Sequence, residues 1–376
     1  MIIGVPAEIR TNEKRVAATP ETIKKLTAQH SVRVQSGAGS GASIPDSDFS
    51  AAGATLAASA AEIYSQSELV LKVRGPDSSE IPMLRRSSML IGLLEPHKGE
   101  SIAALADRGV TAFSLERLPR ISRAQNMDVL SSQANIGGYK AVMLAADRYQ
   151  RFFPMLMTAA GTVKAARVLV LGAGVAGLQA IATAKRLGAV IEAFDVRPAV
   201  KEQVLSLGAK FVEVPISEEE KKAAETAGGY AREMSEEYKN KQAELICERA
   251  KASDIVITTA LIPGKPAPVL IPEATVKEMK PGSVIVDMAI EQGGNCPLTK
   301  YDQIVVKHGV TLIGIANLPA LVAADASALY ARNLLNFLNV LFDPKTGALN
   351  REDEIVTGTM VCADGQVLKT GEMDEG

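Results

Sequence analysis

The chain has few cysteines, histidines and aromatic side chains for its length. Its 376 residues include three cysteines, three histidines and no tryptophan. Cys247, Cys296 and Cys362 are widely spaced and form no CxxC pair, which argues against a disulfide framework and against a metal site. We expect buried thiols in a reducing compartment, and therefore a cytoplasmic protein.

Long apolar runs and blocks of one charge are also missing. No uninterrupted apolar run reaches the roughly 18 residues of a spanning helix. The first residues, MIIGVPAEIR, lack the basic and apolar regions of a signal peptide. Lys and Arg number 41 against 43 Asp and Glu, so no basic footprint for nucleic acid is visible. We expect neither a transmembrane segment here nor a nucleic-acid partner.

Short apolar runs rich in Val and Ile alternate with Ala-rich helical stretches. This pattern predicts βα units and parallel sheets. The runs lie at 1–5, 32–35, 69–73, 89–94 and 110–115, then at 167–172, 190–195, 210–214, 254–259, 283–288 and 311–316. A length of 376 residues suits two domains. The predicted fold class is α/β, with two Rossmann-like domains, each a mostly parallel sheet flanked by helices.

Two helical stretches set the predicted domain boundaries. The stretch 133–154 has helical composition and separates the two groups of strands, so we expect a connecting helix there. The stretch 320–343 is again helical and long enough to cross back onto the first domain. We therefore predict a discontinuous outer domain, 1–132 plus 319–376, and a continuous inner domain, 133–318.

The segment RVLVLGAGVAGLQAIATAKRLGAVIEAFDVR has every part of a dinucleotide fingerprint. Gly172, Gly174 and Gly177 follow a strand in the G-x-G-x-x-G spacing, and a helix and a second strand come next. The first glycine permits the tight turn, the second lets the backbone approach a pyrophosphate, and the third lets helix and strand pack closely. We therefore predict a dinucleotide site in the inner domain.

An acidic residue at the end of the second strand favours NAD. Asp195, 18 residues after Gly177, would accept hydrogen bonds from the ribose hydroxyls and repel a 2′-phosphate. Arg197 leaves the NADP alternative open, because it could pair with that phosphate. Its other interpretations are stacking on the adenine or a surface ion pair.

The segment PRISRAQNMDVLSSQ concentrates polar side chains ahead of this fingerprint. If it is helical, Gln125, Asp128 and Ser131 share one face, and Met127 and Leu130 turn toward the protein. Such a face could orient a nicotinamide carboxamide. The alternative is an N-capped, solvated helix, and the residue pattern alone favours neither.

The chain offers little for acid–base chemistry. A dehydrogenase acting on an alcohol or amine moves a proton as well as a hydride, usually with a His or Lys. We expect solvated or capping roles for His30 and His308, which leaves His97 as the histidine candidate.

The stretch ETAGGYAREMSEEYKNKQ is a long insertion between strands. Its Gly228–Gly229 pair and Tyr230 suggest either a lid hinged at the glycines or an inert surface hairpin.

Several longer segments are similar to one family. PRISRAQNMDVLSSQ, MTAAGTV, GAGVAGLQAIATAKRLGA, ETAGGYAREM, TTALIPGKPAPVLI and GGNCPL together resemble the NAD(H)-binding component, domain I, of proton-translocating nicotinamide nucleotide transhydrogenase. The likeness extends over about residues 1 to 365. GVPAEIRTNEKRVAATP is shared more broadly with alanine dehydrogenases, so the resemblance implies an alanine-dehydrogenase-like outer domain.

That resemblance implies roles for individual residues. The loop that orients the nicotinamide would contain Arg120, Gln125, Asp128 and Ser131, with Gln125 facing the partner's nucleotide. NAD(H) would be held by Gly172, Ala173, Gly174, Val175 and Gly177 at the pyrophosphate and by Asp195, Val196 and Arg197 at the adenosine. The mobile lid would include or rest on Gly229, Tyr230, Gln242 and Leu261.

The likeness to alanine dehydrogenase bears on proton transfer. That family has a Lys after the LKV strand and a His after the next strand, and here Arg74 and Glu95 occupy those places, with His97 as an alternative. An Arg stays charged and cannot act as a base. Arg15, which in that family binds the substrate carboxylate, is retained. Hydride exchange between two nicotinamides needs no substrate proton, only proximity, alignment and exclusion of water.

The predicted function is therefore the NAD(H)-binding subunit of a proton-translocating transhydrogenase. It would exchange hydride reversibly between NADH and NADP⁺ only when docked to separate membrane-spanning and NADP(H)-binding subunits. The family implies a homodimer attached peripherally at the cytoplasmic face of the inner membrane. The alternatives are an alanine dehydrogenase-like amino-acid dehydrogenase using Arg15 and His97, and a non-catalytic NADH-sensing module.

Overall fold

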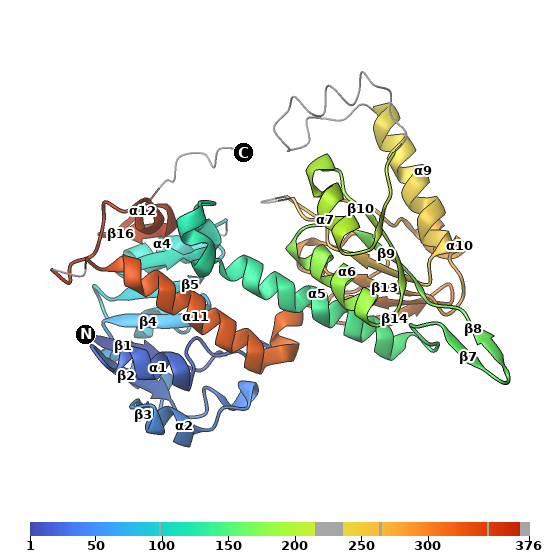
Figure 1. Cartoon of the computed structure of the whole chain (residues 1–376). Helices are drawn as coiled ribbons and strands as arrows, with labels where there is room; N and C mark the ends of the chain where they lie inside the picture. Colours follow the sequence, from blue (N-terminus) through green and yellow to red (C-terminus); the bar gives the residue numbers. More distant parts are fainter. Residues whose placement is uncertain (98, 215–235, 263–264, 344–345, 369–376) are drawn as a thin grey trace. The chain divides into compact units, whose positions relative to one another are not determined.

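Two mostly parallel β-sheets, each covered by helices on both faces, form the chain (Figure 1). The computed structural model describes residues 1–97, 99–214, 236–262, 265–343 and 346–368. The chain divides into one unit of Met1–Gln133 together with the chain from Pro319 on, and a second unit of Ala134–Leu318. The predicted α/β fold class is confirmed. In the described ranges no helix combines the length and the apolar character needed to cross a bilayer.

The first unit contains an eight-stranded sheet in the order β17-β16-β6-β5-β4-β1-β2-β3. Its strands are β1 (Ile2–Val5), β2 (Ser31–Gln35), β3 (Thr55–Ala57), β4 (Leu69–Arg74), β5 (Met89–Leu93), β6 (Thr111–Ser114), β16 (Met360–Ala363) and β17 (Gln366–Val367). Its helices are α1 (Pro20–Leu26), α2 (Asp46–Ala51), α3 (Ala60–Gln66), α4 (Gly99–Asp107), α11 (Ala323–Leu341) and α12 (Glu354–Thr359). β1 to β6 run parallel, and β16 and β17 extend the edge in antiparallel pairing.

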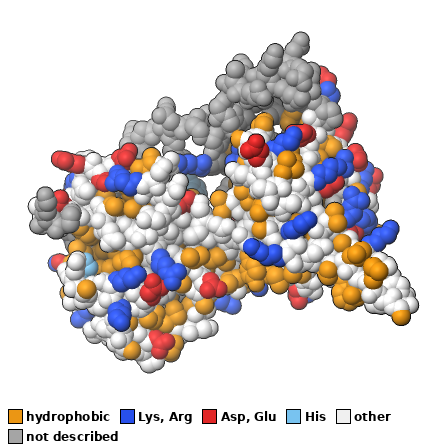
Figure 2. All heavy atoms as spheres, in the orientation of Figure 1, with side chains coloured by type: hydrophobic (Ala, Val, Ile, Leu, Met, Phe, Trp, Pro, Cys, Tyr) orange, Lys and Arg blue, Asp and Glu red, His pale blue; other side chains and the backbone are white. Residues whose placement is uncertain are grey.

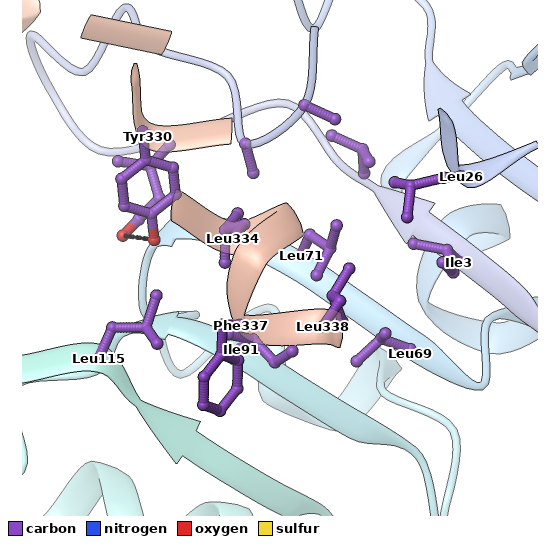
Figure 3. Packing of buried hydrophobic residues seen from close by; sticks show 14 of the residues in the cluster. Ile3, Leu26, Leu69, Leu71, Ile91, Leu115, Tyr330, Leu334, Phe337 and Leu338 are labelled. Atoms are coloured by element: carbon purple, nitrogen blue, oxygen red, sulfur yellow. Dashed lines mark hydrogen bonds between the residues drawn. The ribbon is translucent and has the colours of Figure 1, made fainter. Parts of the chain in front are cut away.

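Alternating apolar side chains place one helix layer on each face of this sheet. In β4, Leu69 and Leu71 enter the core with α1, α2 and α11, while Val70 between them faces the core with α3 and α4. This period of two is expected for a strand buried on both faces. Figure 3 shows Leu334 and Phe337 of α11 packed over the strand residues. The helix predicted at 320–343 is α11, and it packs in this core.

The second unit contains a seven-stranded sheet in the order β11-β10-β9-β12-β13-β15-β14, and a separate two-stranded β7–β8 hairpin. Its strands are β7 (Leu156–Thr158), β8 (Gly161–Val163), β9 (Arg167–Leu171), β10 (Val190–Phe194), β11 (Lys210–Phe211), β12 (Ile255–Thr258), β13 (Val284–Asp287), β14 (Ile304–Lys307) and β15 (Val310–Ile313). The helices are α5 (Val129–Arg148), which begins in the first unit, α6 (Val175–Arg186), α7 (Lys201–Ser206), α9 (Glu236–Ala252) and α10 (Glu273–Glu278).

Helices cover both faces of the second sheet as well. α5, α6 and α7 pack on one face, and α9 and α10 pack on the other. In both units the parallel strands follow one order, with the first strand beside the fourth (β1 with β4, β9 with β12). The connections leave in opposite directions at that point, and open α/β sheets bind ligands there, beyond the carboxyl ends of the strands.

Each predicted strand run contains a strand, and the predicted connecting helix is α5. The short or antiparallel strands β3, β7, β8, β14, β16 and β17 were not predicted. Cys296 and Cys362 are buried as expected, whereas Cys247 is only half-buried.

Candidate functional site

The glycine-rich turn leaves the carboxyl end of β9. Gly172 has a φ of +100°, a conformation that favours glycine, and an added Cβ there would overlap the hydroxyl of Thr259. An added Cβ on Gly177 would overlap the carbonyl oxygen of Gly172, so α6 can approach the turn this closely only with glycine. Gly174 borders open space, since the nearest atom to its added Cβ is Nη2 of Arg197 at 3.9 Å. A ligand can therefore approach the backbone at Gly174.

The start of α6 offers unpaired backbone donors at this open position. The helix begins at Val175, and its first intrahelical bond runs from Leu178 N to Gly174 O at 2.8 Å. The N–H groups of the first turn before Leu178 have no partner within the helix, and the helix dipole favours an anion there. The Ala173 N–H differs, because it donates to Oδ2 of Asp195 at 2.7 Å. Ala173 thus holds Asp195 in place.

The turn lies at the change in strand order between β9 and β12. Thr259, directly after β12, donates its hydroxyl to the carbonyl oxygen of Gly172 at 3.0 Å and its N–H to that of Leu171 at 2.8 Å. These bonds join the ends of the two strands at the position where such sheets bind nucleotides. Leu261 and Ile262 follow, and both are exposed.

Asp195, directly after β10, is already occupied by protein donors. Its Oδ1 accepts from the backbone N and from Nε of Arg197, at 2.9 and 3.0 Å, and Nη2 of Arg197 donates to Oδ2 at 3.0 Å. Burial alone would raise the pKa of Asp195, but these bonds from Arg197 and the bond from Ala173 bring that pKa below its ordinary value. Arg197 was open to pairing with a 2′-phosphate, stacking on the adenine or forming a surface ion pair. In the structure it forms an ion pair with Asp195. The ribose hydroxyls would have to compete with Arg197 for Asp195.

The sequence did not predict the hydrogen bonds that Asn295 and Asp287 make next to the site. The side-chain amide of Asn295 donates to the carbonyl oxygens of Ala260 and Pro268, at 2.9 and 2.8 Å. Beside it, the carboxylate of the buried Asp287 accepts from the backbone N of Cys296 at 3.0 Å. These bonds fix the chain that follows β12. A polar residue at the end of the buried run VIVDM was the available signal.

The remaining residues predicted for this unit are more scattered. Val175 and Val196 are both 39% exposed, near the turn and after Asp195 respectively. Gln242 is half-buried in α9. Gly229 and Tyr230 of the predicted lid lie outside the described residues.

The polar segment of the first unit is only partly helical. Ser122–Met127 forms a 3₁₀ turn, and the chain leaves it at Asp128, with φ −71° and ψ 92°, before α5 begins. Asp128 caps α5, since its carboxylate accepts from the Ser131 backbone N at 2.9 Å and from the Ser131 hydroxyl at 2.5 Å. Gln125 is exposed within the turn, and Arg120 is exposed just before it.

The expected inward face of this segment is half right. Met127 is buried, but Leu130 is 49% exposed. The break at Asp128 rotates α5 relative to the 3₁₀ turn, so a single helical period does not extend across the segment. The condition for a shared face of Gln125, Asp128 and Ser131, one continuous helix, is therefore not met.

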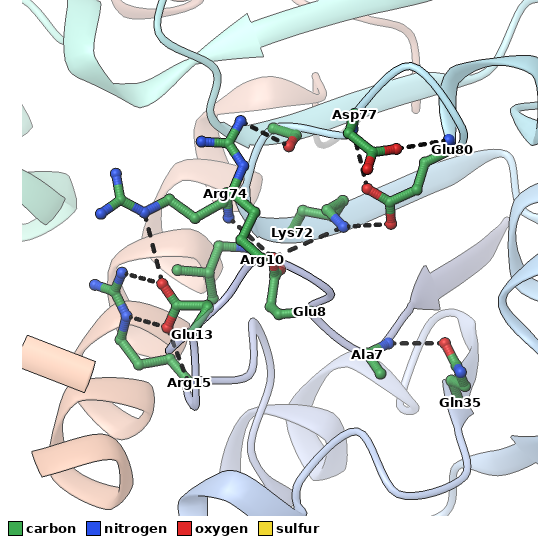
Figure 4. Close-up of polar contacts among 12 residues, drawn as sticks. Ala7, Glu8, Arg10, Glu13, Arg15, Gln35, Lys72, Arg74, Asp77 and Glu80 are labelled. Atoms are coloured by element: carbon green, nitrogen blue, oxygen red, sulfur yellow. Dashed lines mark hydrogen bonds and ion pairs between the residues drawn. The ribbon is translucent and has the colours of Figure 1, made fainter. Parts of the chain in front are cut away.

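Charged side chains gather at the corresponding strand ends of the first unit (Figure 4). The Glu13 carboxylate accepts hydrogen bonds from Nε and Nη2 of Arg15, at 2.8 and 2.6 Å. Nε of Arg74 lies 3.6 Å from Oε2 of Glu13. Arg15 also donates from Nη1 to Gln133 at 2.8 Å. Glu95 pairs with Arg10 at 2.7 Å. The two residues at the places of the alanine dehydrogenase Lys and His are therefore each in an ion pair.

A second, fully buried group lies deeper in the same unit. Lys72 Nζ donates to Glu80 at 2.7 Å and lies 3.7 Å from Glu8. Burial raises the pKa of Glu8, although Lys72 acts in the opposite direction. Burial, followed by the charge of Glu80, raises the pKa of Tyr64. One buried ammonium group thus lies near two buried carboxyl groups, and the raised pKa of Glu8 reduces the unmatched negative charge.

None of the three histidines adjoins these groups through a hydrogen bond among the described residues. His97 is exposed, and His308 bonds Glu273 at 3.0 Å. His30 is half-buried, and burial lowers its pKa.

Comparisons with known proteins agree over nearly the whole chain. Residues 4–137 match the family described as "Alanine dehydrogenase/PNT, N-terminal domain", and residues 141–370 match "Alanine dehydrogenase/PNT, C-terminal domain". The chain is 54% identical to a Rhodospirillum rubrum protein named as one part of NAD(P) transhydrogenase subunit alpha, covering 98% of both chains. It is 30% identical to alanine dehydrogenase of Mycolicibacterium smegmatis, covering 98% of this chain and 95% of that one.

A solved structure gives the same result. The chain superposes on a transhydrogenase from Sinorhizobium meliloti with a TM-score of 0.89 and 46% identity, covering 98% of this chain and 100% of that one. The resemblance predicted from the motifs is confirmed.

Proposed function

The chain belongs to the alanine dehydrogenase/PNT family, and from this premise we propose that it is the NAD(H)-binding subunit of an NAD(P) transhydrogenase. The proposed reaction is reversible hydride transfer between NADH and NADP⁺, coupled to proton translocation in an assembly with a membrane-spanning and an NADP(H)-binding subunit. The likeness to transhydrogenase alpha subunits over 98% of the chain supports this choice within the family.

One observation carries the choice against an amino-acid dehydrogenase. Arg74 and Glu95, at the places of the Lys and His of alanine dehydrogenase, are held by Glu13 and Arg10. An arginine in an ion pair takes up no proton, and a carboxylate bound to a guanidinium is a weak base. Arg15 is likewise bound to Glu13, with which a substrate carboxylate would compete. A site without a poised base suits hydride exchange between two nicotinamides.

NAD(H) fits the residues of the second unit. We assign its pyrophosphate to the turn Gly172–Val175, where Gly174 is open and α6 presents free N–H groups, with Gly177 as the packing glycine. We assign its adenosine to Asp195, Val196 and Arg197. The bound nucleotide supplies or accepts the hydride, and the chain's role is to hold and orient it. The predicted lid is proposed to include or rest on Gly229, Tyr230, Gln242 and Leu261.

The polar loop of the first unit is the proposed orienting element for the nicotinamide. Gln125 is exposed and able to hydrogen bond a carboxamide or a neighbouring ring, while Asp128 and Ser131 fix the backbone after it. Arg120 is exposed before it. Alignment of the reacting ring is the main contribution that a protein makes to hydride transfer between two nucleotides.

The proposed location follows from the proposed partners. The Rhodospirillum rubrum relative is named as a portion of one subunit, which supports an assembly with further subunits. We place the chain in the cytoplasm, attached peripherally to the cytoplasmic face of the inner membrane through those partners.

We also propose a homodimer that uses the β7–β8 hairpin. Met157 in β7 is 71% exposed, Met155 directly before the hairpin is 60% exposed, and nearby Phe152 is 55% exposed. Figure 2 shows apolar side chains along it. A single contiguous apolar arm suits a two-fold contact with the same arm or its base on a second copy. In analytical ultracentrifugation, Met155→Ser/Met157→Ser should sediment as a monomer and the native chain as a dimer. A native monomer would refute the proposal.

The test of function is reconstitution. The purified chain is mixed with the NADP(H)-binding subunit of a related transhydrogenase, and hydride exchange between NADH and an NADP⁺ analogue of shifted absorbance is followed. We expect turnover in the mixture and none with either component alone. Reduction of NAD⁺ by L-alanine with the isolated chain would overturn the proposal in favour of an amino-acid dehydrogenase. Nucleotide-dependent binding without turnover would instead favour a sensor.

A further inference from the structure

Two asparagines of α11 hold the loop that carries Gln125. We propose that Asn333 and Asn336 are positioning residues for hydride transfer, acting through the backbone of that loop. The inference rests on the proposed function of the loop. It concerns residues of α11, some 200 positions further along the chain, that none of the motifs includes.

Both amides converge on a single backbone acceptor. Asn333 Nδ2 donates to the carbonyl oxygen of Asn126 at 2.8 Å, and Asn336 Nδ2 donates to the same oxygen at 2.9 Å. Asn333 is also fixed from its other side, because its Oδ1 accepts from the hydroxyl of Ser132 at 2.7 Å. A carbonyl oxygen has two lone pairs, so the two donors saturate it. The residue next to Gln125 is thereby held in two directions.

The helix that supplies these amides packs on the first sheet. Leu334 and Phe337, each directly after one of the two asparagines, lie in the core and are 1% and 0% exposed. One turn earlier, the Tyr330 hydroxyl donates to the carbonyl oxygen of Lys72 at 2.8 Å. The amides are therefore fixed relative to the end of β4.

The other side of the 3₁₀ turn is fixed by charge. Arg123 forms a bidentate pair with Asp353, the N-cap of α12, at 2.6 and 3.0 Å. Ala124 and Met127 are buried in the core on either side of Gln125. Gln125 is thus an exposed side chain on a backbone held at both neighbours. This is the arrangement expected of a group that must orient a reacting ring without moving.

The energies involved predict a kinetic effect. Loss of one solvent-accessible amide contact changes folding stability little, whereas a shift of about 1 Å in an orienting group can slow a transfer reaction by up to about a hundredfold. Asn336 is the better variant because it is only half-buried, while Asn333 is buried. Asn339, one turn further, is exposed, its side chain makes no hydrogen bond in the described structure, and it is the matched control.

The experiment uses the reconstituted chain and NADP(H)-binding subunit. We expect Asn336→Ala to slow single-turnover hydride transfer at least about tenfold and to change the dissociation constant of NADH less than about twofold. Asn336→Asp, which cannot donate, should behave likewise, and Asn339→Ala should match the native chain. If Asn336 acts through the loop, adding Asn336→Ala to Gln125→Ala should cost little further rate.

Each outcome is decisive. A native rate in Asn336→Ala, or additive losses in the double variant, would refute the positioning role while native turnover upheld the proposed function. Equal losses of rate and of NADH affinity, with a lowered melting temperature, would show a structural role only. Absence of turnover in the native mixture would refute the proposed function itself.

Discussion

Arg197 encloses Asp195, only two residues away, through two side-chain hydrogen bonds of 3.0 Å each. Together with the backbone N–H groups of Ala173 and Arg197, they satisfy both carboxylate oxygens. The Arg197 side chain is 40% exposed, so it can yield to a ribose. The pair therefore has two consequences for selectivity. If NAD(H) binds here as proposed, the Asp195 carboxylate would repel a 2′-phosphate, and by holding Arg197 it would also keep that guanidinium from pairing with the phosphate.

Replacing this carboxylate should change selectivity in a specific way. Asp195→Asn retains the shape but removes the charge, so we expect NADH to bind about tenfold more weakly and NADPH to bind more tightly once Arg197 is released. Titration of the isolated chain with both nucleotides measures the two dissociation constants. Adding Arg197→Ala should abolish the gain for NADPH. If Asp195→Asn keeps the native selectivity for NADH over NADPH, another residue must contact the ribose hydroxyls.

Shortening the proposed orienting side chain should affect rate and affinity differently. Gln125→Asn retracts the amide by one methylene and leaves the backbone held by Asn333 and Asn336. We expect single-turnover hydride transfer to fall about ten- to a hundredfold, with the NADH dissociation constant within about twofold of native. Equal losses in both quantities would assign Gln125 to binding.

Substitutions at two glycines of the turn should distinguish an effect on nucleotide binding from an effect on stability. Gly174→Ala adds a methyl group to open space, so we expect unchanged melting temperature and weaker NADH binding, because the methyl group blocks backbone approach. Gly177→Ala forces α6 away from Gly172 and should lower stability by about 1–3 kcal/mol as well. Calorimetry and nucleotide titration of both variants test the contrast. Gly99→Ala, with no atom near its added Cβ, is the control. Native NADH affinity in Gly174→Ala would place the pyrophosphate elsewhere.

The ion pair between Arg123 and Asp353 should make the stability of the fold depend on pH. The hydrogen bond from Arg123 lowers the pKa of Asp353 from its ordinary 3.8, against the effect of burial. A carboxyl group with a depressed folded pKa stabilises the fold above its unfolded pKa, and that contribution is lost as pH falls through the folded pKa. Asp353→Asn keeps an N-cap for α12, so we expect a melting temperature about 1–3 °C lower at pH 7. The difference from native should shrink below about pH 3.8. A difference independent of pH would show that charge is not its cause.

Local patterns were enough to predict most of the fold. The runs around Leu69–Arg74 and Arg167–Leu171 are buried on both faces, so their composition alone identified them as strands. β3 and the β7–β8 hairpin were missed because they are short and largely exposed, and lack a continuous apolar run. The glycine spacing likewise predicted the turn conformation, because the positive φ of Gly172 is a property of the turn itself.

The details of the site depend on contacts that local patterns do not encode. The bond from Asn336 to Asn126 joins residues 210 apart, and nothing near either residue indicates the other. The break at Asp128 arises because its side chain caps α5, which the period of a helix cannot reveal. The ion pair of Asp195 with Arg197 was one of three options for a nearby cation, and only coordinates could select it. The roles of these residues toward nucleotides stay predictions.

The return of the chain to the first unit at α11 has a consequence for biosynthesis. The six parallel strands of the first sheet are synthesised by β6, but α11, which covers one of their apolar faces, is synthesised only after the whole second unit. The second unit emerges from the ribosome as one uninterrupted segment and can fold first. Until residues 323–341 are synthesised, the nascent first unit exposes apolar surface. A chaperone that binds this surface at that stage should raise the yield of active protein.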